Sequence, residues 1–208
     1  MWNHWRRRWL GRAFREGEFA PLFAPPPGDE RIALDFETTS LDPERAEIVS
    51  IGAVRIQDNR LLTGEALTLK VQPPASLSAQ SVVIHGLRHQ DLQQGLTLEA
   101  ALRLLLDFIG PRELVGYHIA YDLRILNLAC QRLWGLPLPQ RGIEVSRLYH
   151  DNLYRRYPDA AIDLHLAAIC QHLALPPLPV HDALSDAITA ALIYLRLTQG
   201  GPLAYPKV

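Results

Sequence analysis

The stretch Arg31-Ile-Ala-Leu-Asp-Phe-Glu-Thr-Thr39 is the part of the sequence that most strongly constrains the fold. Its short apolar run predicts a β-strand over residues 31–36. Because side chains alternate along a strand, Asp35 and Glu37 project from the same face. Two adjacent carboxylates repel each other, and a hard divalent cation is a common compensation. The pair alone also fits a solvated strand end, so a metal site needs support from the rest of the chain.

Outward from this strand, apolar periodicity and turn residues predict the other elements. A second strand is expected over 47–57, and Asp58-Asn59 supplies a turn into a returning strand over 61–71. Thr97 is the expected N-cap of a helix that ends at Gly110. Further strands are expected over 113–117 and 142–146, and helices over 120–134, 163–173 and 182–198. This order predicts an α/β fold with a mixed five-stranded sheet flanked by helices.

The ends of the chain differ in composition from its centre. We predict a basic, Trp/Arg-rich amphipathic arm over residues 1–20, a proline-rich linker over 21–29, a folded domain over 30–200 and a tail over 201–208. The first 15 residues hold five arginines and no acidic residue, with tryptophans at helical spacing. Such an arm fits contact with nucleic acid, docking on a partner protein, an anionic membrane surface, organellar targeting, or packing back onto the domain.

The overall composition excludes several classes of protein. The 208 residues are 48% hydrophobic and 21% charged, values typical of a globular protein. No run of about 18 apolar residues is present, so no membrane span is expected, and a cytoplasmic location is the default. Cys130 and Cys170 lack zinc-binding spacing and are expected to be buried thiols. The formal net charge of −1 gives by itself no reason to expect a polyanionic partner.

Two more segments place acidic residues at the ends of predicted elements. Asp122 falls in the first turn of the helix over 120–134, where the helix dipole favours an acid whatever its function. His181 lies at the entrance of the last helix, with Asp186 one turn inside and Asp182 as the expected N-cap. Four carboxylates can hold two Mg²⁺ ions that activate water and stabilise a leaving oxygen. A histidine suits removal of a proton from that water near neutral pH.

These residues resemble the three motifs of the DEDDh 3′-to-5′ exonucleases. The order is Asp35-x-Glu37, then Asp122, then His181-x-x-x-x-Asp186. The segments Ile48–Ile56 and Ile84-His85-Gly86-Leu87 are similar to the family's second strand and its substrate-side segment. Within the family the chain looks most like the proofreading subunits of bacterial replicative polymerases and their stand-alone homologues.

The resemblance implies a ribonuclease-H-like fold and a catalytic site. Asp35, Glu37, Asp122 and Asp186 would bind two divalent ions, Mg²⁺ or Mn²⁺, and His181 would be the general base. The substrate would be the 3′ end of single-stranded DNA or RNA, with release of nucleoside 5′-monophosphates.

Substrate contacts are expected from Thr38, Thr39, His85 and His118, although Tyr117-His118 replaces the family's common His-Asn pair. His85 equally fits a surface-loop histidine with no substrate role. Two other functions stay open: a non-catalytic nucleic-acid-binding or polymerase-accessory module, and a phosphodiesterase on short oligonucleotides. A degenerate module would be expected to lose site residues, and all five are present, so the sequence favours an enzyme.

Overall fold

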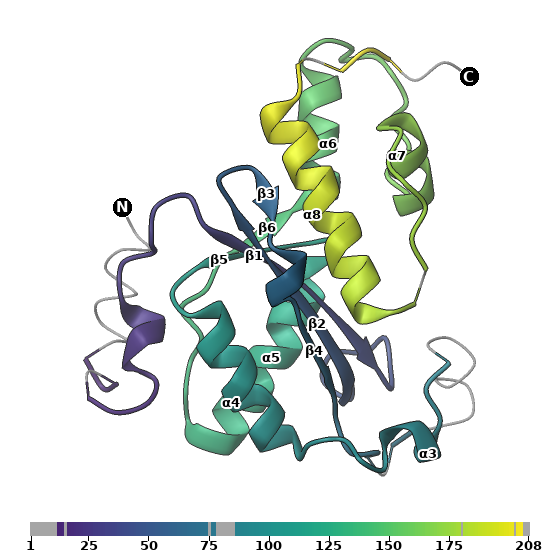
Figure 1. The fold of residues 1–208 in the computed structure, drawn as a ribbon. Helices are drawn as coiled ribbons and strands as arrows, with labels where there is room; N and C mark the ends of the chain where they lie inside the picture. Colours follow the sequence, from purple (N-terminus) through teal and green to yellow (C-terminus); the bar gives the residue numbers. More distant parts are fainter. Residues whose placement is uncertain are drawn as a thin grey trace.

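A mixed β-sheet forms the centre of the computed structural model, which describes residues 12–14, 16–74, 76–77, 86–179, 181–201 and 203–205. Strand β1 (Arg31–Thr38) pairs antiparallel with β2 (Ile48–Gln57) and parallel with β5 (Glu113–Gly116). Strand β6 (Gly142–Glu144) pairs parallel with β5 at one edge. Figure 1 shows helices on both sides of this sheet. The predicted α/β architecture is therefore confirmed.

The other edge of the sheet differs from the prediction. The expected strand over 61–71 is divided into β3 (Arg60–Leu61) and β4 (Leu67–Lys70), and both pair with β2. A short 3-10 turn, η2 (Thr63–Glu65), separates them. The sheet thus contains six strands in place of the expected five, because the chain leaves the ladder for this turn and then returns to the same edge. The Asp58-Asn59 turn is as expected, with positive φ at both residues.

Five helices of seven or more residues surround the sheet in the part of the chain that the structure describes. Helices α4 (Leu98–Ile109), α5 (Ile119–Trp134), α7 (Leu166–His172) and α8 (Ala183–Gln199) occupy predicted segments. Helix α6 (Val145–Tyr154) and the single turn α3 (His89–Leu92) were not predicted. The signal for α6 is present in the sequence, since its three buried residues, Val145, Tyr149 and Leu153, recur at intervals of four.

Alternate residues of β1 supply two separate cores. Ile32, Leu34 and Phe36 face the cluster formed with α4 and α5. Ala33 faces the opposite cluster, which includes residues of α6, α7 and α8. Because strand side chains alternate, Asp35 and Glu37 continue the row that begins with Ala33, on the α8 side of the sheet. The pattern of β1 therefore directs the two carboxylates toward α8.

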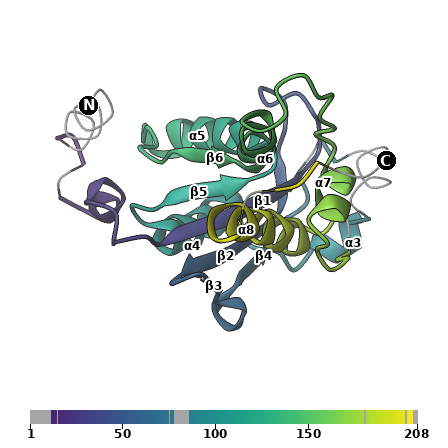
Figure 2. The same ribbon diagram turned by 90° about the horizontal axis from the view of Figure 1, so that it is seen from above.

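The described part of the N-terminal segment lies against the domain. Phe14 and Phe23 stack with centroids 5.7 Å apart, and Phe19 lies 4.9 Å from the ring of Trp134 at the end of α5. Leu22, in the 3-10 turn η1 (Ala20–Phe23), is only 2% exposed within the first core. Figure 2 shows this purple segment at the side of the molecule opposite α7. Among the alternatives for the arm, packing onto the domain is therefore seen for the described residues from Phe14 to Phe23, while Trp2, Trp5 and Trp9 lie outside the described residues.

The described residues of the predicted tail also contact the domain. Leu203 is 4% exposed and belongs to the second core. The Tyr205 hydroxyl donates to the Ala161 carbonyl at 2.9 Å.

Cys130 is buried as predicted, whereas Cys170 is only half-buried. In the part of the chain that the structure describes, no helix combines the length and apolar character needed to cross a membrane.

Gly52 allows the start of α8 to sit directly on the sheet. It pairs with Asp35 across the β1–β2 ladder. A Cβ atom at Gly52 would lie 2.1 Å from the Ala183 carbonyl carbon and 2.2 Å from the Leu184 nitrogen. Both of these are backbone atoms in the first turn of α8, so no side-chain rotation could relieve the clash. The absence of a side chain at Gly52 thus brings Asp186, one turn further along α8, close to Asp35.

We therefore expect Gly52→Ala to displace the N-terminus of α8. Overpacking of this kind costs about 1–3 kcal/mol or more, and the displaced Asp186 should remove most of the activity as well. Thermal unfolding and a nuclease assay measure the two effects. Gly64→Ala is the matched control, because its Cβ would meet no atom within 4 Å and should change stability by less than about 0.5 kcal/mol. Equal behaviour of the two variants would contradict this role for Gly52.

Candidate metal centre

Three carboxylates from two elements converge on the α8 face of the sheet. Asp35 and Glu37 come from β1, and Asp186 comes from the first turn of α8. One ligand oxygen from each lies within 4.8 Å of the others. Asp182 is the N-cap of α8 and accepts from the Ser185 amide at 3.0 Å, as predicted. Its structural role is therefore to start the helix that presents Asp186.

Asp122 approaches the centre from α5, on the other side of β1. It is 3% exposed, and its Oδ1 accepts a hydrogen bond from the Phe36 backbone amide at 3.2 Å. Phe36 lies between Asp35 and Glu37, so this bond fixes Asp122 beside the pair. The structure thus gathers Asp35, Glu37 and Asp186 within ligand distance and places Asp122 next to them.

Burial, followed by repulsion between the carboxylates, destabilises the charged forms of these acids. Burial raises the pKa of Asp35 well above its ordinary value, and the negative charges of Asp122 and Asp186 raise it further. Burial, followed by Asp186 and Asp182, raises the pKa of Glu37 to about 7. Burial also raises the pKa of Asp122 to about 8, against the opposing effect of its backbone hydrogen bonds.

A divalent cation fits this donor set. The converging ligand atoms are carboxylate oxygens, which hard cations such as Mg²⁺ and Mn²⁺ prefer. The raised pKa values show that the negative charge is under-compensated by the protein itself. Bound cations would remove that repulsion, so the burial of these acids is explained most simply by a metal centre.

His181 stands at the entrance of α8 in an unusual backbone conformation. Its φ of 59° is in the left-handed region, and its backbone amide donates to Asp186 Oδ2 at 3.1 Å. The side chain is exposed to solvent. The backbone amide of His181 therefore helps to orient the Asp186 carboxylate.

The predicted substrate contacts occupy different positions. Thr38 ends β1, one residue after Glu37, and Thr39 begins the loop that follows. His118, with a φ of 59°, is the exposed residue before α5, and its ring lies 4.2 Å from that of Tyr117. His85 lies outside the described residues. The structure therefore places Thr38 and Thr39 beside the centre and His118 at the start of the helix that carries Asp122.

Two residues near the centre were missed by the sequence analysis. Glu144, at the end of β6, accepts from the Ile119 amide at 3.1 Å and from the Ser146 hydroxyl at 2.8 Å, so one carboxylate joins the starts of α5 and α6. Tyr121 lies beside Asp122 on α5 and contacts Thr38. An acid at the end of a strand was a detectable signal for Glu144, whereas nothing in the sequence marked the Tyr121 hydroxyl.

One model of a protein family matches most of the folded part of the chain. A family model described as "Exonuclease" (RNase_T) matches residues 32–194, which include all of the converging carboxylates. The chain belongs to this exonuclease family. The resemblance to DEDDh 3′-to-5′ exonucleases is thereby confirmed, and with it the assignment of the chain as an exonuclease-type hydrolase.

Individual relatives in this exonuclease family include parts of bacterial DNA polymerases. The chain is 32% identical over 168 residues to the PolC-type DNA polymerase III of Thermotoga petrophila, and the match covers 81% of the chain but only 12% of that polymerase. It is 27% identical over 180 residues to the DNA polymerase III subunit epsilon of Rickettsia felis, covering 85% of the chain and 77% of that subunit.

Solved structures share the fold of this exonuclease domain. Escherichia coli exonuclease I, in complex with an oligonucleotide, superposes with a TM-score of 0.67 at 14% identity, over 83% of the chain and 41% of that protein. The cell-death related nuclease 4 gives a TM-score of 0.65 at 18% identity, over 84% of the chain and 65% of that protein. These similarities confirm the ribonuclease-H-like exonuclease fold.

Proposed function

We propose that this chain is a metal-dependent exonuclease that removes nucleotides from the 3′ end of single-stranded DNA and releases nucleoside 5′-monophosphates. The observation that carries the proposal is the convergence of Asp35, Glu37 and Asp186 within 4.8 Å. Asp122 is held beside them by the Phe36 amide. A centre of this kind, in a member of an exonuclease family, supports hydrolysis of a phosphodiester bond.

The four carboxylates would hold two divalent ions, Mg²⁺ or Mn²⁺. Such ions, when bound, lower the pKa of a coordinated water and stabilise the leaving oxygen of a phosphodiester. The protein supplies the positions: β1 presents Asp35 and Glu37 on one face, α8 presents Asp186 and α5 presents Asp122. The presence of four carboxylates around one place supports the proposed count of two ions.

His181 would act as the general base. Its exposed imidazole lies at the start of α8, and its own amide is bonded to the Asp186 carboxylate. The ring would accept a proton from the attacking water on the side of the centre that is open to solvent. Thr38, Thr39, His85 and His118 would contact the terminal nucleotide.

DNA is the preferred substrate because several relatives are named as DNA polymerase III proteins. A structure of exonuclease I described as a complex with single-stranded DNA supports a single strand as the substrate. A DNA polymerase, or another protein, would be the partner of the arm over residues 1–20, whose first 11 residues lie outside the described part of the chain. A cytoplasmic location would follow from such a partner.

The test is a nuclease assay on 5′-labelled single-stranded DNA and RNA, with Mg²⁺, Mn²⁺ or EDTA. We expect a ladder that shortens from the 3′ end on DNA, only when metal is present and only with the unmodified protein. The Asp186→Ala variant, checked for folding by circular dichroism, is the control. Inactivity of a folded wild-type protein on every substrate would overturn the proposal, and activity restricted to very short oligonucleotides would favour the phosphodiesterase alternative.

A further inference from the structure

Helix α5 is tied to the chain that follows the first two metal ligands. The β1–β2 loop (residues 39–47) begins two residues after Glu37. The Tyr121 hydroxyl, on α5, lies 2.7 Å from Thr38 Oγ1 and within hydrogen-bond contact of the Ser40 carbonyl. Thr38 Oγ1 also donates to the Ser40 carbonyl at 3.1 Å. These contacts form a triangle of three oxygens that joins a helix, a strand and a loop.

The number of hydroxyl protons limits how many hydrogen bonds this triangle can contain. Two hydroxyl groups bring two protons to three oxygen–oxygen contacts, so two of the contacts can be hydrogen bonds at once. If Tyr121 lost its hydroxyl, Thr38 would still donate to Ser40, but that bond lies within the strand and its loop. The link from the loop to α5 at this point therefore depends on the Tyr121 hydroxyl alone.

The second link between α5 and the loop is weaker. Arg124, one turn after Tyr121, pairs with Glu44 through Nε at 2.9 Å. Both side chains are about half exposed, at 51% and 54%. Exposed ion pairs contribute little, because water and salt screen them and long side chains lose freedom. The part of the loop at Ser40 is thus held to α5 by Tyr121, and the part at Glu44 by an exposed pair.

The rest of the loop is held by contacts within it and by Ser76, whose hydroxyl donates to Thr39 Oγ1 at 2.9 Å and to the Glu47 carboxylate. Asp42 accepts hydrogen bonds on its carboxylate from the Glu44 amide and on its carbonyl from the Ala46 amide. The Thr39 amide donates to the Glu47 carbonyl at 3.1 Å, which closes the base of the loop. Leu41, between the two links to α5, is 85% exposed. The base of the loop is therefore held by Ser76 and by Ala46 in the first core, and the links to α5 hold the segment from Ser40 to Glu44.

A phosphodiester held at the proposed metal centre would lie close to the start of this loop. Thr38 follows Glu37 directly, and consecutive residues of a strand are about 3.3 Å apart. A nucleotide whose phosphate contacts the carboxylates would therefore lie within reach of Thr38 and Thr39. We propose that the Tyr121 hydroxyl is a positioning group that fixes the β1–β2 loop against α5 and thereby sets how tightly the terminal nucleotide of a single strand is bound. This proposal rests on the proposed function.

Tyr121→Phe tests the proposal because it removes one oxygen and keeps the ring that packs against the first core. We expect amide hydrogen exchange over residues 39–46 to accelerate. We also expect KM for a 5′-labelled single-stranded oligonucleotide to rise about 3- to 10-fold, the effect of one lost hydrogen bond. The value of kcat, which depends on the metal centre, should change by less than about 2-fold.

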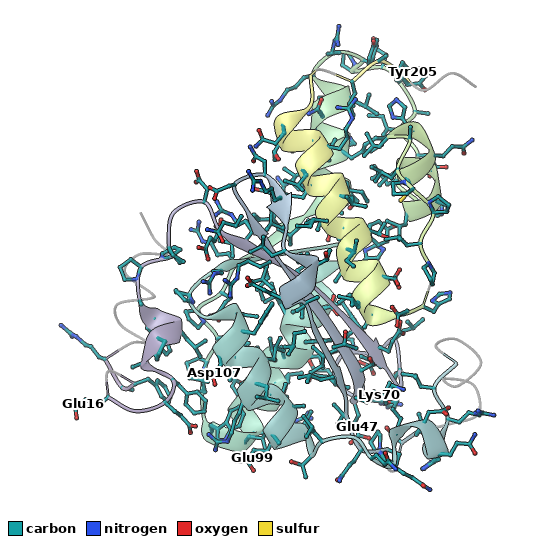
Figure 3. All side chains as sticks on the ribbon, in the orientation of Figure 1. Glu16, Glu47, Lys70, Glu99, Asp107 and Tyr205 are labelled. Carbon is teal, nitrogen blue, oxygen red and sulfur yellow. The ribbon has the colours of Figure 1, made fainter. Side chains whose placement is uncertain are left out.

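Tyr205→Phe is the matched control. The Tyr205 hydroxyl also donates to a backbone carbonyl, at 2.9 Å, but Figure 3 shows Tyr205 at the end of the molecule opposite Glu47, which belongs to the β1–β2 loop. This variant should leave KM, kcat and exchange in the loop unchanged. If both variants altered KM equally, the loss of a tyrosine hydroxyl would act through general stability, and the proposal would be wrong.

The exchange and kinetic measurements separate this inference from the proposed function. Unchanged exchange over residues 39–46 in Tyr121→Phe would overturn the link to α5. Faster exchange with unchanged KM would overturn its role in nucleotide binding. If the wild-type protein cleaved nothing, the proposed function would fail, and the dissociation constant of the same labelled oligonucleotide, measured by fluorescence anisotropy, would take the place of KM. A 3- to 10-fold weaker complex of the variant would then still support the positioning role.

Discussion

Asp35→Asn is expected to abolish exonuclease activity and, at the same time, to make the metal-free protein more stable. A bound metal ion stabilises the transition state of phosphodiester hydrolysis by several kcal/mol, and each 1.36 kcal/mol is a factor of ten, so we expect a loss of about 10³-fold or more. The stability should move the other way, because the variant removes a charge that Asp122, Asp186 and Glu37 all oppose.

The gain in stability should depend on pH in a definite direction. The pKa of Asp35 is raised in the folded protein, so the folded state holds a proton that the unfolded state has already lost. Stability of the wild-type protein in EDTA therefore falls as the pH rises from about 4 through the raised folded-state pKa values, which are about 7 for Glu37 and about 8 for Asp122. The melting temperature of Asp35→Asn should exceed that of the wild type by about 2–8 °C at pH 8, and by less at pH 5.

Asp182→Asn separates the loss of a ligand from the loss of a charge. Asp182 also raises the pKa of Asp35, but it is the exposed N-cap of α8, and asparagine caps helices equally well. We expect this variant to keep activity within a few-fold of the wild type. A loss of activity equal to that of Asp35→Asn would show that total charge, and not ligation by Asp35, sustains the reaction.

Most of the fold could be predicted because local patterns and tertiary contacts agree. The alternation in β1 placed Asp35 and Glu37 on one face, and the structure packs α8 on that face. Helix α6 was missed because the strand β6 runs into it without a break, and Glu144 serves as both the last residue of β6 and the N-cap of α6. The division of the third strand into β3 and β4 could not be predicted, because it is defined by how the two short segments pair with β2 on either side of a turn.

The site was predictable to the extent that its chemistry resides in side chains. The residue types and the order of Asp35, Glu37, Asp122 and Asp186 indicated a metal site from the sequence alone. Three of them converge as expected. Gly52 and Tyr121 could not be found in this way, because their roles depend on where other elements lie. Gly52 is important because the backbone of α8 packs directly against it. The Tyr121 hydroxyl is important because it contacts the Ser40 carbonyl, 81 residues earlier in the chain.

His181→Asn is expected to lower kcat by about 10²–10⁴-fold, the usual contribution of a general base, while leaving metal binding intact. Asparagine is the appropriate replacement because His181 has a φ of 59°, a left-handed conformation that asparagine tolerates and most residues do not. The backbone amide at residue 181 should therefore still donate to Asp186 Oδ2. Single-turnover kinetics measures the loss, and titration of the metal-free variant with Mn²⁺, followed by calorimetry, measures the affinity for metal.

His118→Asn provides the comparison, because His118 has the same φ of 59° and also stands just before a helix that carries a metal ligand. The two variants thus replace a histidine by asparagine at the same left-handed φ, so the cost of that φ cannot account for a difference between them. A substrate contact at His118 should raise KM, whereas a base at His181 should lower kcat. If His181→Asn lowered Mn²⁺ affinity in proportion to kcat, the histidine would act by orienting Asp186, and proton transfer would have to be assigned to another group.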